Sequence, residues 1–343
     1  MLKMKIIIII SIITAISIAL FQFRYFVKQG YYIAKYKLSE KSVESLLKSP
    51  NIDPETKNFL ILTQEIRDFA FNEIGLTRNN NFTSIIKTPN NFLHYLITIC
   101  EEDNFNVLNR KYILFGEFPY KAFFEKDDVM KEANHYKKRG YDVHVRTVNA
   151  FSFLGILSDP LYFYMKEYSP YSLASIMIHE QTHATVFIKN NVQFNEEFAS
   201  FVEQEGALRF IEHKYGSQEL KDAKNQINDR KAFNRFFRSL YNDLADMYKT
   251  LPTKEERLLQ KQIIIEKYKE TFKKDYYKLF SLDTFLGFEE RDWNNAMIMG
   301  FMHYVEKENV FYDLLKKNNN NLKETVLQVK AIPKNSKDPY GAL

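Results

Sequence analysis

One short segment of the chain places two histidines and a carboxylate inside an apolar stretch. Residues 179–183 read His-Glu-Gln-Thr-His. In a helix, His179 and His183 project from the same face one turn apart, because they stand four residues from each other. This spacing suits two nitrogen ligands of one tetrahedral zinc ion. Glu180 follows the first ligand, where its carboxylate can reach a zinc-bound water rather than the metal.

The residues around this segment favour a buried helix. Residues 176–178 are Ile-Met-Ile and residues 184–187 are Ala-Thr-Val-Phe. Burying two imidazoles and a carboxylate costs free energy unless something pairs with them. A chance His-Glu-x-x-His is expected roughly once per hundred chains of this composition. The alternative, a helix with two solvated or hydrogen-bonded histidines, is therefore the weaker interpretation.

A third ligand has to come from elsewhere, and a second helical pattern supplies candidates. The apolar residues from Phe194 to Phe210 fall near helical spacing, and Asn195 is a plausible N-cap. Glu196 and Glu203 are seven positions apart and share a face of this helix, so either could be the ligand. Glu197 and Glu205 are expected on the solvent-exposed surface of the helix.

These segments resemble the "putative aminopeptidase" family of bacterial envelope proteins, which are zinc enzymes of the gluzincin type. The resemblance extends over about residues 30–330. Its strongest part is the pair of segments Ile178–Phe187 and Gln193–Ala207. Weaker matches are residues 120–124, 140–143, 150–155, 158–160, 293–296 and Tyr304.

The resemblance implies a peptidase that holds one Zn²⁺ through His179, His183 and Glu196, since the Glu of Asn-Glu-x-x-Ala is the third ligand in gluzincins. Glu180 is then the general base. Tyr304 and Tyr120 are candidate donors to the oxyanion, although core packing is the commoner role of a tyrosine.

Glu203 and Asn195 are candidates for a supporting contact at the metal or for binding the substrate's amino group. The Gly-x-Met-Glu-Asn segment that binds this amine in well-known zinc aminopeptidases is missing. Aminopeptidase action therefore depends on the family, and a zinc endopeptidase is an alternative. A second alternative is a non-catalytic helical envelope protein.

The composition predicts a folded protein with an ample core, since 45% of the residues are hydrophobic and 15% are aromatic. The net charge of +5 comes from interspersed charges of both signs, so nucleic acid is not an expected partner. A peptide is the expected substrate, and the sequence gives no oligomeric state. The one cysteine, Cys100, allows no disulfide within the chain and is expected to be buried.

Residues 1–29 differ from the rest. Lys3 and Lys5 precede an apolar stretch, residues 6–21, and Arg24 and Lys28 follow it. The stretch spans about 24 Å as a helix and has no efficient cleavage site. The pattern predicts an uncleaved signal-anchor that spans the cell membrane, with a cleaved signal peptide as the alternative. The basic residues on the two sides do not decide the orientation. The signal-like order and the resemblance to the family imply that the remaining chain is extracytoplasmic.

We expect an α+β fold that is predominantly helical, with a zincin-like active-site helix beside a small sheet. One peptidase domain, residues 30–335, would comprise a zinc core (106–213) and a C-terminal helical part (227–330). Strands are expected at 106–118 and 141–150, paired with each other. Expected helices are Tyr31–Leu47, Pro54–Ile74, a hairpin from Lys231 to Lys274, and Arg291–Leu315.

Overall fold

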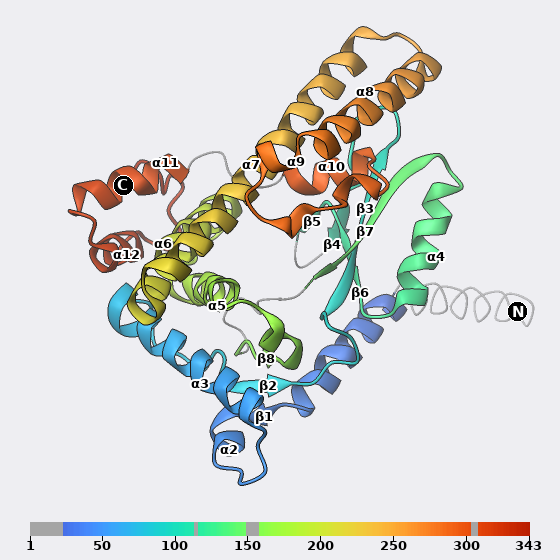
Figure 1. Cartoon of the computed structure of the whole chain (residues 1–343). Helices are drawn as coiled ribbons and strands as arrows, with labels where there is room; N and C mark the ends of the chain where they lie inside the picture. The colour runs from blue at the N-terminus through green and yellow to red at the C-terminus, as the bar shows by residue number, and fades with distance from the viewer. Residues whose placement is uncertain (1–22, 113–115, 149–157, 303–307) are drawn as a thin grey trace, which may run out of the picture.

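The chain folds into a predominantly helical α+β structure, as the sequence predicts (Figure 1). The computed structural model describes residues 23–112, 116–148, 158–302 and 308–343. A helix over residues 23–38 comes first. The helices that follow are α2 (Val43–Leu47), α3 (Pro54–Phe69), α4 (Lys126–Lys137), α5 (Pro170–Thr185), α6 (Val192–Tyr215), α7 (Ser217–Thr250), α8 (Lys254–Lys274), α9 (Tyr276–Leu279), α10 (Asn295–Met302), α11 (Glu308–Lys317) and α12 (Leu322–Lys330). The strands are β1 (Lys41–Ser42), β2 (Ser84–Ile86), β3 (His94–Glu101), β4 (Arg110–Tyr112), β5 (Gly116–Phe118), β6 (Lys121–Phe123), β7 (Tyr141–Val148) and β8 (Leu161–Tyr162).

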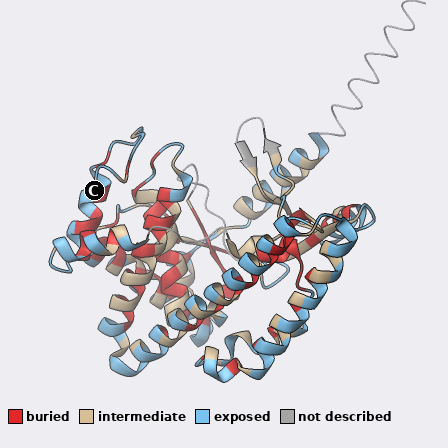
Figure 2. Ribbon diagram, turned by 90° about the horizontal axis from the view of Figure 1, so that it is seen from above, coloured by how far each residue is buried: buried red, intermediate tan, exposed pale blue. Residues whose placement is uncertain are grey.

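The helix that carries the His-Glu-x-x-His segment lies in the largest core of the described chain. α5 begins where the Ser169 hydroxyl accepts the Ser172 amide and Pro170 occupies the first turn. Its apolar residues pack with those of α3, α6, α11 and α12 in one cluster. Figure 2 shows buried residues gathered in these helices, whereas the outer faces of α7 and α8 are exposed. Burial therefore fixes α5 on most sides.

Close packing of α5 against α6 depends on a glycine. A Cβ atom added at Gly206 would lie 2.6 Å from Cδ1 of Ile74 and 3.3 Å from Cδ1 of Ile178. Only hydrogen fits in that space, because real Cβ atoms do not approach carbon so closely. Ile178 directly precedes His179, so this contact sets the distance between the two helices next to the His-Glu-x-x-His segment.

Two small sheets lie in different parts of the fold. In the first, β2 pairs with β1 antiparallel and with β8 parallel, and its Ile85, Ile86 and Leu161 belong to the same core as α5. In the second, β3 is central and pairs antiparallel with both β6 and β7. α4 packs on the second sheet through a separate cluster that includes Val129 and Val143.

The helices α7 and α8 form a long antiparallel hairpin, as predicted for residues 231–274, although α7 begins earlier, at Ser217. The turn ends in a capping box, in which Thr253 and Glu256 satisfy each other's backbone amides. A third, largely aromatic cluster that includes Phe237, Phe272 and Trp293 joins the hairpin to α10. This cluster is separate from the core around α5.

Several predicted strands are wrong in their extent or their partners. Residues 106–118 do not form one strand, because β4 and β5 pair with each other as a short hairpin. Tyr141–Val148 is a strand, as predicted, but its partner is β3 rather than the 106–118 segment. β3 is buried along most of its length, so apolar and polar residues do not alternate in it as they do in a half-exposed strand. The sheet that shares the core with α5 is β1-β2-β8 instead.

Helix boundaries differ from prediction in three places. The predicted helix Tyr31–Leu47 is interrupted at residues 39–42, where β1 forms before α2. The helix expected over Phe194–Phe210 extends over Val192–Tyr215, so Asn195 lies within its first turn and is not the N-cap. The predicted helix Arg291–Leu315 comprises α10 and α11, with residues 303–307 outside the described chain.

The predicted membrane-spanning helix falls largely on residues 1–22, which lie outside the described residues. Within the described chain, every helix is too short or too polar to cross a bilayer. The described helix 23–38 is attached to the fold by Lys28, whose Nζ lies 2.6 Å from Glu125 and 2.5 Å from Asp128.

Candidate metal centre

Two helices bring three ligand-type side chains to one point. His179 and His183 come from α5, and Glu196 comes from the second turn of α6. One ligand atom from each lies within 4.8 Å of the other two, and in the described part of the chain this is the one such group of His, Cys, Asp and Glu. The predicted pairing of the His-Glu-x-x-His helix with Glu196 is thus present in the fold.

The distances within the group suit a small divalent cation. Nε2 of His183 lies 3.1 Å from Nε2 of His179. The Glu196 carboxylate lies 3.6 Å from the His179 nitrogen and 3.5 Å from the His183 nitrogen. Ligand atoms of a tetrahedral zinc ion, each about 2.0–2.1 Å from the metal, are about 3.3 Å from one another. The three side chains therefore fit zinc without a large rearrangement.

Glu203 contacts the group from behind the first histidine. Its Oε2 lies 3.0 Å from Nδ1 of His179, and since a carboxylate only accepts, Nδ1 carries the proton and donates it. In the neutral ring, the opposite nitrogen, Nε2, then has a lone pair directed towards Glu196 and His183, which a metal cation would take in place of a proton. A carboxylate in this position fixes the ring and its tautomer, as is common for histidines that bind metals. The structure thus separates Glu196 from Glu203, which the sequence spacing could not do.

The electrostatics of the group favour an added positive charge. Burial lowers the pKa of His179, but hydrogen bonds to Glu196 and Glu203 outweigh burial and raise it well above the usual value. Burial raises the pKa of Glu196, yet the two imidazoles outweigh this effect and hold that pKa well below its usual range. The Glu196 carboxylate therefore remains ionised and attracts either a proton or a metal cation.

Glu180 has an unsatisfied carboxylate oxygen next to the group. Its Oε2 is buried and has no hydrogen-bond partner within the described chain. A buried carboxylate oxygen left without a donor costs free energy, so such an atom indicates a missing water or substrate group. Glu180 is the residue after His179 on α5, so this oxygen belongs to the same turn of helix as the first histidine.

Asn195 has a different role from the one considered for it. Its amide accepts from the Ile188 backbone N–H at 2.9 Å and donates to the Ile188 carbonyl at 2.9 Å. Asn195 is buried, and this pair of bonds holds the loop between α5 and α6 against the start of α6. The side chain therefore shapes the connection between α5 and α6.

The prediction that Glu197 is solvent-exposed was wrong, because the residue is buried. Only 3% of its surface is exposed, and its carboxylate accepts from Gln193 at 2.9 Å and from Tyr340 at 2.5 Å. Glu205, also expected on the surface, is partly buried beside Arg209 at 3.7 Å.

The remaining predicted residues have different outcomes. Tyr304 lies outside the described residues. Tyr120 lies between β5 and β6, with its ring 5.7 Å from that of Phe118. Among the other histidines, His135 and His213 are exposed and His144 is partly buried.

The sequence did not predict one residue that lies near the group, Arg230. Nη1 of Arg230, on α7, lies 3.9 Å from Oε1 of Glu203. The Arg230 side chain is 71% exposed, so the pair contributes little to stability. Its importance is chemical, since it places a guanidinium beside the carboxylate that orients His179. The sequence separation from Glu203 hides this proximity.

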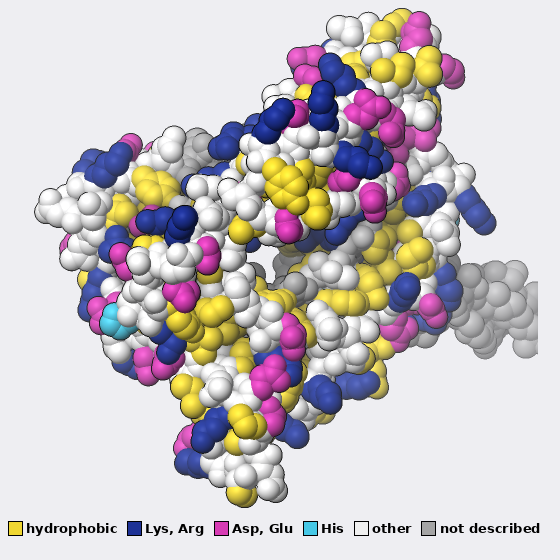
Figure 3. All heavy atoms as spheres, viewed as in Figure 1, with side chains coloured by type: hydrophobic (Ala, Val, Ile, Leu, Met, Phe, Trp, Pro, Cys, Tyr) yellow, Lys and Arg dark blue, Asp and Glu magenta, His cyan; other side chains and the backbone are white. Residues whose placement is uncertain are grey.

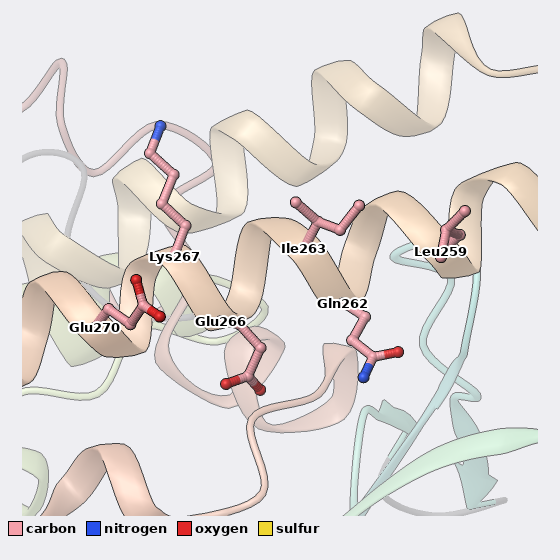
Figure 4. A pocket seen from close by; sticks show the side chains of 6 residues that line it. All are labelled: Leu259, Gln262, Ile263, Glu266, Lys267 and Glu270. Carbon is pink, nitrogen blue, oxygen red and sulfur yellow. The ribbon is translucent and has the colours of Figure 1, made fainter.

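The group reaches the surface through Glu196, whose side chain is 45% exposed. Figure 3 shows a hollow in the middle of one face, between the helices α5 and α7 on one side and the sheet β6-β3-β7 on the other. A separate shallow groove runs along α8, lined by Leu259, Ile263 and Glu266 among others (Figure 4). None of the residues that line this groove belongs to α5 or α6, so the groove is unrelated to the metal group.

Comparisons with known proteins agree with the geometry at the level of the family. Searches of curated proteins and of solved structures each return no match. A family model described as "Putative aminopeptidase" matches residues 24–339, which is nearly the whole chain and includes all three ligand candidates. On that match, the chain belongs to the putative aminopeptidase family.

Proposed function

We propose that the protein is a zinc-dependent peptidase whose centre is formed by His179, His183 and Glu196. The observation that carries the proposal is the convergence of these three side chains at 3.1–3.6 Å from one another. The orphaned oxygen of Glu180 supports it independently, because a structural histidine pair needs no unpaired carboxylate beside it. Family membership supports the reaction class.

Zinc bound at this position would make a water nucleophilic near neutral pH and polarise the carbonyl of the substrate. Glu180 accepts the proton of the attacking water and delivers it to the departing amine. Glu203 keeps Nδ1 of His179 protonated and leaves Nε2 free to bind. His183 presents its Nε2 from the next turn of the same helix.

We propose aminopeptidase action in particular because of the family, with endopeptidase action as the alternative. An aminopeptidase binds the free ammonium group of its substrate through acidic side chains. Glu203 is a poor candidate for this task, since its two oxygens are next to His179 and Arg230. Comparing a peptide with a free N-terminus and the same peptide after N-acetylation would separate the two activities.

The proposal is tested by measuring hydrolysis of a fluorogenic peptide mixture with the full chain, before and after removal of metal by a chelator. We expect activity to disappear with the chelator and to return with one equivalent of Zn²⁺. The variant His183→Ala should bind no zinc and remain inactive after zinc is added. Activity that survives complete removal of metal would refute the proposal.

We also propose that residues 6–22 hold the enzyme at the cell membrane, with the metal centre on the extracytoplasmic side. The apolar composition of that stretch and the lack of an efficient cleavage site support it. Mass spectrometry of the protein from native membranes tests retention, since a mature N-terminus near Leu20 would mean cleavage. Protease treatment of spheroplasts tests the orientation, because a cytoplasmic centre would stay protected.

A further inference from the structure

The last residues of the chain cross the loop that joins the two ligand helices. The Lys189 amide donates to the Lys334 carbonyl at 2.8 Å. The Asn191 side chain donates to the Ser336 carbonyl at 3.0 Å. Asn195 holds the same loop from inside, through Ile188. The loop is thus fixed between the start of α6 and the C-terminal segment, residues 331–343.

The C-terminal segment also binds α6 itself, beside the metal ligand. The Tyr340 hydroxyl donates to Oε2 of Glu197 at 2.5 Å. The Tyr340 ring packs edge-on against Phe194, with 5.0 Å between the ring centroids, and lies 6.4 Å from Phe311. Gln193 donates to the other Glu197 oxygen. These contacts surround a carboxylate that is only 3% exposed.

Glu196 depends on its helix for its position. Its side chain is 45% exposed, so surrounding atoms do not pack it into place. Glu197 is the next residue along α6 and points about 100° away around the helix axis. A bond that fixes Glu197 therefore limits rotation of the first turns of α6, and with it the direction of the Glu196 carboxylate. Metal ligands tolerate displacements of only a few tenths of an ångström.

We propose that Tyr340 is a positioning residue for the metal centre: by binding Glu197, the C-terminal segment sets the rotation of α6 and holds Glu196 towards His179 and His183. The inference rests on the proposed function, because it assigns Glu196 as a ligand. Tyr340 touches neither substrate nor metal and acts through the helix.

A general contribution to stability is the competing explanation, and it has a different signature. A stabilising contact changes the melting temperature without changing the affinity of the folded protein for zinc. A positioning contact changes the zinc affinity of the folded protein and the local opening of residues 186–197. The chain offers a matched control in Tyr268, whose hydroxyl donates to Asp243 at 2.8 Å within the α7–α8 hairpin.

The experiment compares the full chain with Tyr340→Phe, which keeps the ring and removes only the hydroxyl. Zinc affinity is measured by competition with a chromophoric chelator at a temperature where all variants are folded. Hydrogen–deuterium exchange of residues 186–197 is measured on the metal-free proteins. We expect zinc binding to weaken by about tenfold in Tyr340→Phe, as for loss of a group that supports a ligand. Exchange of residues 186–197 should become several-fold faster.

Two further variants complete the test. Glu197→Gln retains an oxygen that can accept from Tyr340 and should stay close to the parent in zinc affinity. Tyr268→Phe should bind zinc as the parent does. Parent-like zinc affinity and exchange in Tyr340→Phe would overturn the positioning role while leaving the proposed function intact. Equal weakening in Tyr268→Phe would also overturn it, by showing a general effect.

Failure of the proposed function has its own outcome in this experiment. A parent chain that binds no zinc would refute the zinc centre, and the positioning role of Tyr340 with it. The exchange data on the metal-free proteins would then still report whether the C-terminal segment holds the loop. The zinc affinity of the parent therefore distinguishes failure of the proposed function from failure of the positioning role alone.

Discussion

Oε2 of Glu203 lies 3.0 Å from Nδ1 of His179. The ring nitrogen on the other side of the same imidazole faces Glu196. The two glutamates of one helix face thus contact opposite edges of one ring. This arrangement assigns them different tasks, since one carboxylate is placed to bind a cation and the other to hold the histidine that binds it.

The two tasks predict different zinc affinities for two variants. Glu196→Ala removes a ligand, so we expect no zinc to remain after dialysis. Glu203→Ala leaves all three ligands in place but frees the His179 ring, so zinc should bind about 10–100-fold more weakly. Metal analysis and chelator competition measure both effects. If Glu196→Ala kept a full equivalent of zinc and Glu203→Ala lost it, the two roles would be reversed.

Replacing the proposed general base should separate binding from chemistry. Glu180→Gln preserves the shape of the side chain but cannot accept a proton. We expect zinc to stay bound, while kcat falls by a factor on the order of a hundred or more. Peptide hydrolysis with the zinc-loaded variant is the measurement. Hydrolysis at the parent rate would show that another group takes the proton from water.

The proposed metal ligands on α5 could be predicted because their geometry is local. His179 and His183 are four residues apart in a helix, so their side chains lie on the same face whatever the rest of the fold is. The choice between Glu196 and Glu203 could not be made from spacing, since both lie on the same face of α6. It depends on how far along α6 the helix α5 packs, which contacts such as that of Gly206 with Ile178 determine.

The wrong predictions about Glu197 and β3 share a cause, which is contact between distant parts of the chain. Glu197 reads as helix surface until the C-terminal segment, 143 residues away in the sequence, covers it with Tyr340. β3 is buried along most of its length between its partners β6 and β7, so it lacks the alternation of a half-exposed strand. Hydrophobic periodicity identifies only the face that one helix or strand buries. It cannot predict that a distant segment covers Glu197, or that both faces of β3 are buried.

Gly206 offers a test of the packing between the ligand helices. In Gly206→Ala the new methyl group would lie 2.6 Å from Ile74 and 3.3 Å from Ile178, both of which are buried. We expect a loss of about 1–3 kcal/mol in the free energy of unfolding, together with weaker zinc binding. Gly300, in α10, is the control, because a Cβ there meets no described atom within 4 Å.

Gly300→Ala should stabilise its helix by roughly 0.5–1 kcal/mol, since glycine is unfavourable inside a helix. Chemical denaturation of both variants, with zinc removed, measures the two changes. A Gly206→Ala protein as stable as the parent would mean that Ile74 can move aside at no cost, and that the close approach of α5 and α6 does not require glycine.

Two histidines of the second sheet should make the fold sensitive to acid. Burial, followed by the charge of Arg146, lowers the pKa of His94 to about 4, and the same causes with Arg291 lower the pKa of His144 to about 4. An unfolded chain takes up these protons near the ordinary pKa of about 6.5, whereas the folded chain resists until about pH 4. The stability contributed by each neutral ring is therefore complete above pH 6.5 and is lost as the pH falls towards 4.

The loss amounts to at most about 3 kcal/mol for each histidine over that interval. In His144→Gln one of the two titrating groups is gone, so the unfolding free energy should fall less steeply between pH 6.5 and 4 than in the parent. His135→Gln, which replaces an exposed ring on α4, should keep the parent's slope. Urea denaturation at several pH values, on metal-free proteins, gives the slopes. The metal group is the same in all three proteins, so its own titration cancels when their slopes are compared. Equal slopes of unfolding free energy against pH for His144→Gln and the parent would contradict the burial of a neutral imidazole in β7.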